Sequence, residues 1–175
     1  MNADSLVQEL AVRVYQQPLL GVRSETDYPS LSNPLHLAVL LIDCDTEIEM
    51  NGMLGFLENM TGRHLPETIE ALHLIGAPKC AALFCSIQAC MTKFGVSWQR
   101  LRADFEGTTE FEITSFRKMH GDRLDSFATE VGELASGFSL FSARSSPEDA
   151  YSALCTYLDS RLDELRQEIN NRRVA

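Results

Sequence analysis

The chain has 175 residues, of which 45% are hydrophobic, and 25 acidic against 15 basic residues give it a formal net charge of −10. This length suits a single domain with its own core, and the acidity argues against nucleic acid and anionic membranes as direct partners, because a phosphate-binding surface needs clustered Lys and Arg. The apolar runs fall far short of the roughly 20 residues that span a bilayer and the N-terminus lacks a secretory pattern, so we expect a cytoplasmic protein.

Two helices are predicted in the first third of the chain, separated by a long connection. Apolar residues at helical spacing predict a helix over residues 5–16, with Asp4 or Ser5 as its N-cap. Residues 17–33 contain prolines, a glycine and polar residues, which are typical of a connection that crosses the surface. Asn33 and Pro34 suit the N-cap and first position of a second helix, whose apolar block continues to Ile42.

Residues 43–50 alternate acidic with other side chains, a period of two that is typical of a strand. We nevertheless predict a helix, because Glu, Met and Leu favour helices whereas Asp and Glu are depleted in strands. Over residues 51–60, apolar side chains recur every three or four positions, which predicts a short helix that closes at Thr61 and Gly62.

Two further helices follow, each beginning at a proline. Pro66 begins the first, which Gly76 stops, and Pro78 begins the second. The run over residues 79–91 is apolar on nearly all sides, which predicts a helix in the middle of a bundle.

The second half of the chain is less regular. Residues 98–105 fit one helical face, residues 107–113 suit a loop or a short strand, and residues 122–135 form a clearer helix. Residues 136–146 are a serine-rich connection whose Phe138 and Phe141 we expect against the core.

A last helix is predicted from Pro147, with Ser146 as its N-cap and Asp149 in capping-box position. Leucines at spacings of three and four continue to Ile169 and suit docking on the bundle, with a coiled-coil or dimer surface as the alternative. The predicted fold is an all-α, single-domain multi-helix bundle over residues 1–175.

Cysteine and histidine patterns give no support for a metal site or for catalysis. Five cysteines, an odd number without framework spacing, indicate reduced thiols. Cys80, Cys85 and Cys90 are five residues apart, so each is turned by about 140° from the last around a helix and they cannot converge on one ion. The four histidines show neither paired metal-ligand spacing nor a neighbouring nucleophile motif. We therefore predict no enzyme, no cofactor and no metal.

The acidic side chains of residues 43–70 are the most one-sided charge in the chain. On a helix, Asp43 with Glu47 and Asp45 with Glu49 form like-charge pairs four apart, each costing roughly 0.2–0.5 kcal/mol. They would place negative charge at intervals of about 6 Å, a spacing comparable to that of neighbouring phosphates on DNA. A solvated acidic face, present only for solubility, is the simpler interpretation.

The order of residues in this stretch resembles a bacterial family of small helical proteins. Glu47, Ile48, Gly52, Phe56 and Asn59 are similar to its motif E-V-x-N-G-G-F-x-Q-F-x-x-N, and Leu72, Ile75, Gly76 and Ala77 are similar to its L-x-x-I-G-A. The resemblance covers about residues 35–165. Its best-known member acts as a DNA mimic, so the resemblance implies a mostly α-helical domain, a homodimer and an acidic surface that occupies the DNA-binding face of a transcriptional regulator.

The sequence departs from that motif at four positions. Met50 and Asn51 replace the motif's Asn and Gly, Met53 replaces its Phe, and Gly55 replaces its Gln. These changes raise the question of whether the family activity is redirected or lost in this chain. The motif's Gly, Phe and Asn suit a close turn and a core anchor better than a contact surface.

Our leading hypothesis is a non-enzymatic protein that binds a basic DNA-binding protein in competition with DNA. The alternative is an immunity-type or other binding protein that covers a toxin or an enzyme through a pocket or an apolar patch. A soluble domain of other function, with an acidic solvated surface, is the third interpretation. The predicted partner-binding residues share only their charge: Asp43, Asp45, Glu47, Glu49, Glu58, Glu67, Glu70, Glu110 and Glu112.

Overall fold

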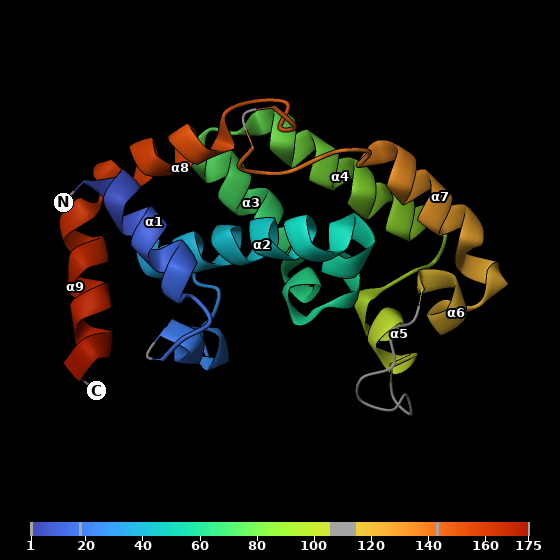
Figure 1. The fold of residues 1–175 in the computed structure, drawn as a ribbon, viewed down its shortest axis with the longest axis horizontal. Helices are drawn as coiled ribbons and strands as arrows, with labels where there is room; N and C mark the ends of the chain where they lie inside the picture. The colour runs from blue at the N-terminus through green and yellow to red at the C-terminus, as the bar shows by residue number, and fades with distance from the viewer. Residues whose placement is uncertain (1, 18, 106–114, 143, 175) are drawn as a thin grey trace.

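A computed structural model describes residues 2–17, 19–105, 115–142 and 144–174, and within these ranges the secondary structure is helical without strands (Figure 1). The prediction of an all-α fold is confirmed. Within these ranges, no helix combines the length and apolar character that crossing a membrane requires. The predicted loop or strand at residues 107–113 lies outside the described residues, as do Glu110 and Glu112.

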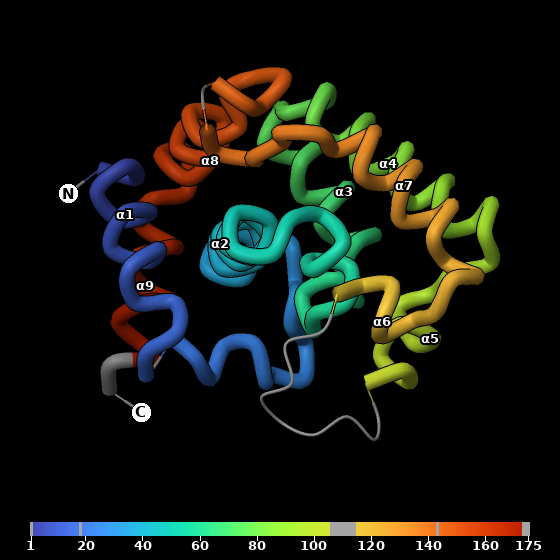
Figure 2. Tube along the Cα trace, turned by 45° about the vertical axis from the view of Figure 1, so that its right-hand side comes forward, coloured from blue at the N-terminus to red at the C-terminus, as the bar shows by residue number. Residues whose placement is uncertain are grey.

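The bundle is built around helix α2 (Pro34–Glu58), which the other helices surround (Figure 2). The Asn33 side chain accepts hydrogen bonds from the Leu35 and His36 amides, and Pro34 occupies the first turn, so the helix begins as predicted. Residues 34–44 are all buried, and α2 contacts α1, α3, α5, α7 and α9. The acidic alternation thus continues the central helix of the fold, and the helical prediction for residues 43–50 is confirmed.

Gly52 interrupts α2, and this explains part of the sequence motif. Its φ of 68° and ψ of 179° are not helical, and such a backbone favours glycine because it lacks a Cβ. Beyond the break, Met53, Phe56 and Leu57 point into the core, where the Phe56 ring packs edge-on against Phe84 at 5.9 Å. The motif glycine and phenylalanine therefore shape the fold.

Two departures from the motif, at positions 51 and 55, compensate for each other sterically. A Cβ on Gly55 would lie 2.2 Å from the Cβ of Asn51, so a side chain at position 55 is incompatible with this placement of Asn51. The motif has its larger residue at 55 and glycine at 51, and this chain has the reverse. The pair exchanges which position carries the side chain, so that only one side chain occupies the space between positions 51 and 55 beside the Gly52 break.

The segment after α2 lies tightly against it. The 3₁₀ helix η2 (Met60–His64) follows directly, and a Cβ on Gly62 would lie 2.4 Å from the Phe56 carbonyl oxygen. Only glycine permits this close approach of two backbones. It holds Thr61, Arg63 and His64 beside the middle of α2.

On one side of α2 lie α1 (Ala3–Arg13), α8 (Ala150–Asp159) and α9 (Leu162–Val174) (Figure 1). The first helix begins earlier than predicted, because Asn2 caps it through the Ser5 amide, in place of Asp4 or Ser5. The predicted last helix is wrong in two respects. Asp149, not Ser146, is its N-cap, and the leucine seam divides into two helices at residues 160–161. The buried Leu165 and Ile169 dock α9 on the bundle.

On the other side lie α3 (Leu65–Ile75), α4 (Pro78–Lys93) and α7 (Asp125–Leu134). The prediction that residues 79–91 form a central helix is wrong. One face of α4 is buried through Cys80, Phe84, Ile87 and Cys90, but Cys85 and its neighbours are exposed. Ala82, Cys85 and Ala89 lie on the exposed face, so apolar residues occupy both faces of α4 although only one face is buried.

Three short helices, α5 (Trp98–Ala103), α6 (Phe116–His120) and η3 (Asp122–Leu124), close one end of the bundle. The connection at residues 136–146 is confirmed, with Phe138 and Phe141 half-buried against the core. The segment predicted as a surface connection at residues 17–33 is more ordered than expected. It contains the 3₁₀ helix η1 (Leu19–Ser24), and its Leu19 and Val22 are buried.

Candidate functional site

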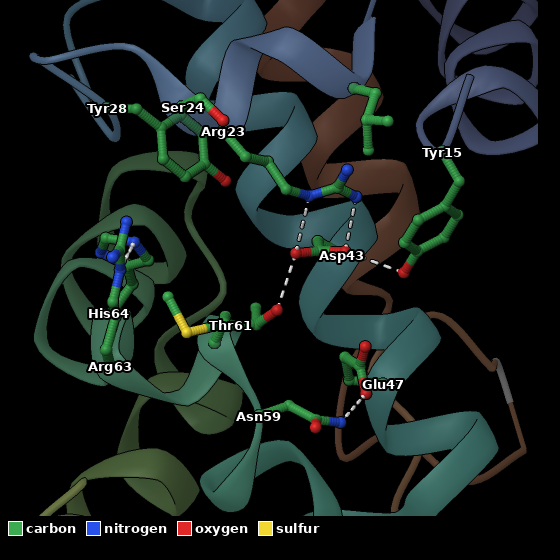
Figure 3. Close-up of a pocket in the computed structure, with 12 residues that line it drawn as sticks. Tyr15, Arg23, Ser24, Tyr28, Asp43, Glu47, Asn59, Thr61, Arg63 and His64 are labelled. Atoms are coloured by element: carbon green, nitrogen blue, oxygen red, sulfur yellow. Dashed lines mark hydrogen bonds and ion pairs between the residues drawn. The ribbon is translucent and has the colours of Figure 1, made fainter. Parts of the chain in front are cut away.

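A pocket of about 440 Å³ lies between η1, the middle of α2 and η2 (Figure 3). The tight packing of η2 against α2 forms one wall, and η1 with Tyr28 forms the opposite wall. The volume is in the range of pockets that hold small molecules. Its lining combines charged, aromatic and apolar side chains: Tyr15, Leu20, Arg23, Ser24, Tyr28, Asp43, Glu47, Asn59, Met60, Thr61, Arg63 and His64.

Asp43 lies at the centre of the pocket wall, and protein groups bind both of its carboxylate oxygens. Oδ1 accepts from the Tyr15 hydroxyl at 2.8 Å and from Arg23 Nη2 at 2.6 Å. Oδ2 accepts from Arg23 Nε at 3.1 Å and from Thr61 Oγ1 at 2.7 Å. The Asp43 side chain is 6% exposed, so its charge is compensated inside the protein by the two-pronged contact with Arg23.

The surroundings of this ion pair are also ordered. Arg23 donates a further hydrogen bond to the Val14 carbonyl at 2.9 Å, and its guanidinium lies 4.6 Å from the centre of the Tyr15 ring. Burial, together with the neighbouring Asp43 carboxylate, raises the pKa of the Tyr15 hydroxyl well above its usual value. Tyr15 therefore remains a hydrogen-bond donor to Asp43 at all ordinary pH values.

Glu47 faces the same pocket one turn further along α2. Its Oε2 accepts hydrogen bonds from the side-chain amides of Asn59 and Asn51. The Asn59 contact links the first part of α2 to the chain that follows the Gly52 break. The Asn59 carbonyl in turn accepts from the Trp98 indole at 2.8 Å, so the motif residues Glu47 and Asn59 join α2, η2 and α5.

Arg63 and His64 lie on the other side of the pocket from Glu47 (Figure 3). Arg63 Nε donates to His64 Nε2 at 2.7 Å. Burial and the neighbouring Arg63 charge lower the pKa of His64. A neutral imidazole can accept this hydrogen bond, so Arg63 is oriented by a neutral group and keeps its full positive charge.

The Tyr28 hydroxyl is buried and has no hydrogen-bond partner within the described ranges. Its ring packs edge-on against His64 at 5.4 Å and against His36 at 5.5 Å. Burial raises its pKa, so the hydroxyl keeps its proton. Figure 3 shows it pointing into the pocket.

The predicted partner-binding acids do not form one exposed row. Residues two apart on a helix are turned by about 200°, so Asp43 and Glu47 face the pocket while Asp45 and Glu49 face away from it. Asp43 must be removed from the exposed set, because it is buried and bound to Arg23. Asp45 accepts from the Phe141 amide at 3.0 Å and is half-buried, and burial, followed by the neighbouring Glu49, raises its pKa. Glu49 itself is exposed.

The remaining predicted acids lie apart from this row. Glu58 is largely buried against His120, Glu67 is half-exposed on the first turn of α3, and Glu70 is exposed on the same helix. Glu49 and Glu70 are the exposed members of the set for which the described residues offer no cation partner.

The sequence did not indicate the cluster around His120. Its Nδ1 lies 2.7 Å from Asp104 Oδ2 and its Nε2 lies 2.6 Å from Glu58 Oε1, while its side chain is completely buried. Each ring nitrogen of His120 therefore lies within hydrogen-bond distance of one carboxyl oxygen. Burial raises the pKa of Glu58, and the hydrogen bond from His120 opposes that effect. The cluster joins the end of α2 to α5 and α6.

Glu25, Asp27 and His36 place potential metal-ligand atoms within 4.8 Å of one another, a group that the sequence also did not indicate. Protein groups already bind two of the three. His36 Nδ1 accepts from the Ser30 amide, its Nε2 faces Glu25 at 3.0 Å, and Arg172 donates to the same Glu25 oxygen at 2.8 Å. The Arg172 charge repels a cation, so these contacts describe an internal polar cluster better than a metal site.

Five of the twelve lining residues lie between positions 15 and 28, where the sequence predicts the end of a helix and a surface connection and gives no sign of a pocket. One signal was available: Asp43 is a charged residue directly after the buried run 35–42, and a buried carboxylate requires a partner.

Comparison with known proteins identifies one family. A family model described as DMP19-like protein matches residues 29–161. The search of curated proteins found no match, and neither did the search of solved structures. The matched residues contain α2, η2 and the motif, whereas Tyr15, Arg23 and Tyr28 precede them. Because the match covers most of its length, the chain belongs to the DMP19-like protein family.

Proposed function

We propose that this protein is a non-enzymatic binding protein whose acidic surface occupies the DNA-binding face of a basic protein, such as a transcriptional regulator. Its membership of the DMP19-like family carries the proposal. The net charge of −10 is consistent with it, because a DNA-binding face is rich in Lys and Arg.

The structure limits which acids can serve this function. Asp43 is paired internally with Arg23, and Glu58 is hydrogen-bonded to the buried His120. We propose Glu49 and Glu70 as the principal contacts, with Asp45 and Glu67 contributing from partly exposed positions. Charges on such a surface are screened by salt over about 10 Å at 0.1 M, so binding that depends on them weakens as salt rises.

The test begins with proteins retained from a lysate of the native organism at low salt and released at high salt. Each retained protein is then purified, and its DNA affinity is measured with and without this chain. We expect competition with DNA, and we expect the triple variant Asp45→Asn, Glu49→Gln, Glu70→Gln to lose it while remaining folded. Glu133→Gln, an exposed acid on α7, is the matched control.

Two results would contradict the proposal: a retained protein that binds this chain and DNA together, or a complex that the triple variant leaves unchanged. A complex that survives high salt would favour the alternative, a protein that covers a toxin or an enzyme. The exposed apolar side chains Met50, Met60 and Leu20 would then be the positions to change.

A further inference from the structure

We propose that the pocket between η1, α2 and η2 binds a small zwitterion of the amino-acid class, with its carboxylate toward Arg63 and Tyr28 and its ammonium toward Glu47. This inference goes beyond the acidic surface of the proposed function, because it concerns a different, concave part of the molecule. It depends on the charges, donors and acceptors that line the pocket.

The charge balance of the pocket is the first step of the argument. Asp43 and Arg23 neutralise each other through two contacts of 2.6 and 3.1 Å. His64 is neutral because burial and Arg63 lower its pKa. One negative charge, Glu47, and one positive charge, Arg63, then remain on different sides of the pocket (Figure 3). A ligand that carries one charge of each sign complements this arrangement, whereas an ion of one sign would face repulsion from one of them.

The Arg63 side is built to receive a carboxylate. His64 holds the Nε group of Arg63, and no carboxylate in the described parts of the chain pairs with its terminal nitrogens. A guanidinium that is positioned by a neutral acceptor offers an uncompensated, planar pair of donors, which matches a carboxylate. The Tyr28 hydroxyl adds a buried donor that the described residues leave unused. A ligand carboxylate would supply the missing acceptor, and burying a hydroxyl without one is unfavourable.

The Glu47 side is built to receive an ammonium group. Both amides that bind Glu47, those of Asn51 and Asn59, donate to the same oxygen, Oε2. Among the described residues no donor binds its Oε1, and Figure 3 shows this oxygen on the side of the pocket. These amides also fix the side chain, so little conformational entropy is lost when a cationic group binds.

The remaining lining suits an organic ligand of modest size. Leu20, Met60 and Tyr15 are 42%, 51% and 46% exposed, which leaves an apolar surface beside the polar groups. A volume of about 440 Å³ exceeds that of one amino acid, so the pocket could also hold a short peptide. A phosphate dianion fits less well, because Glu47, the remaining negative charge of the pocket, would oppose its charge.

The experiment measures binding of each of the twenty L-amino acids to the full chain by calorimetry, with a thermal-shift screen first. We expect saturable binding of at least one. For that amino acid, the deaminated carboxylic acid and the decarboxylated amine should each bind at least tenfold more weakly, because each lacks one of the two charged contacts. Peptides of two residues form a second arm, which distinguishes a free amino acid from a peptide end.

Variants assign the contacts. Arg63→Gln and Glu47→Gln should each weaken binding at least tenfold, and Glu47→Gln retains an acceptor for Asn59. Tyr28→Phe removes the hydroxyl alone and should weaken binding by about three- to tenfold. The matched control for Arg63 is Arg123→Gln, because Arg123 is exposed on η3, and Glu133→Gln is the control for Glu47. Circular dichroism confirms that each variant is folded.

Three results would overturn the inference. They are no saturable binding by any amino acid or dipeptide at about 10 mM, equal binding of the deaminated acid, and unchanged binding by Arg63→Gln or Glu47→Gln. Loss of competition with DNA in the triple surface variant would not bear on it, so the two proposals fail separately.

Discussion

The two sides of α2 use the same residue types for opposite purposes. On the pocket side, Asp43 is buried and bound by Arg23, Tyr15 and Thr61, and Glu47 is held by two amides. On the other side, Glu49 is exposed and Asp45 has only a backbone donor within the described ranges. The formal charge of a stretch of sequence is therefore a poor measure of its surface charge, because half of this row is already used inside the protein.

The largest effect should come from the pocket side. Asp43→Asn leaves the Arg23 guanidinium, whose side chain is 19% exposed, without its counter-charge, and removing one partner of a buried ion pair costs about 3 kcal/mol. Urea unfolding should show this loss in the free energy of unfolding. The matched control is Asp163→Asn, whose carboxylate pairs with Arg166 but is 98% exposed, so no measurable change is expected. Equal effects of the two substitutions would mean that Asp43 is not compensated internally.

An intermediate effect is expected at His120. His120→Ala leaves the Glu58 and Asp104 carboxylates facing each other and removes the ring that packs 4.4 Å from Phe116. We expect a loss of about 2 kcal/mol in the free energy of unfolding, because two charge-assisted hydrogen bonds disappear.

The loss of free energy of unfolding in His120→Ala should depend on pH. Burial already raises the pKa of Glu58, and in His120→Ala the hydrogen bond that opposes the increase is absent. A carboxyl whose pKa is higher in the folded than in the unfolded protein takes up its proton preferentially when folded, so falling pH stabilises the fold. The difference in free energy of unfolding between His120→Ala and wild type should therefore become smaller as the pH falls from about 7 to about 5. Urea unfolding across that range measures it. A deficit that does not change with pH would argue that the cluster acts through packing alone.

The smallest effect on stability is expected on the exposed side. Glu49→Gln and Glu70→Gln should change the free energy of unfolding by less than about 0.5 kcal/mol, because neither carboxylate has a described partner to lose. If either substitution cost as much as Asp43→Asn, the contrast between the two sides of α2 would be wrong.

Local signals in the sequence predicted much of the fold. Asn33 with Pro34 marked the start of α2, Gly76 marked the end of α3, and Pro78 marked the start of α4, because caps and breakers act within a few residues. Longer-range features were not predictable in this way. Whether apolar residues on α4 are buried depends on which helices pack against it, and the break that separates α8 from α9 lacks a proline or glycine.

The candidate site was harder to predict than the fold. The motif identified Glu47 and Asn59, but not that they bind each other across the Gly52 break. Arg23 and Tyr28 approach Asp43 and Arg63 only after the chain folds, and their sequence neighbours show no pattern that anticipates it. Charge patterning placed Asp43 in the exposed row. Helical periodicity gives the direction of a side chain, but it does not show which group from another segment pairs with it.

The contact between Trp98 and Asn59 has a practical consequence. Trp98 is the single tryptophan of the chain, and its indole donates to the backbone of a residue whose side chain holds Glu47. The tryptophan fluorescence of the protein, excited at wavelengths that tyrosine does not absorb, therefore comes from one indole that is two hydrogen bonds away from the pocket carboxylate. A rearrangement of Asn59 would change the polarity around that indole, so the chain carries its own optical reporter on the state of the pocket, without an added label.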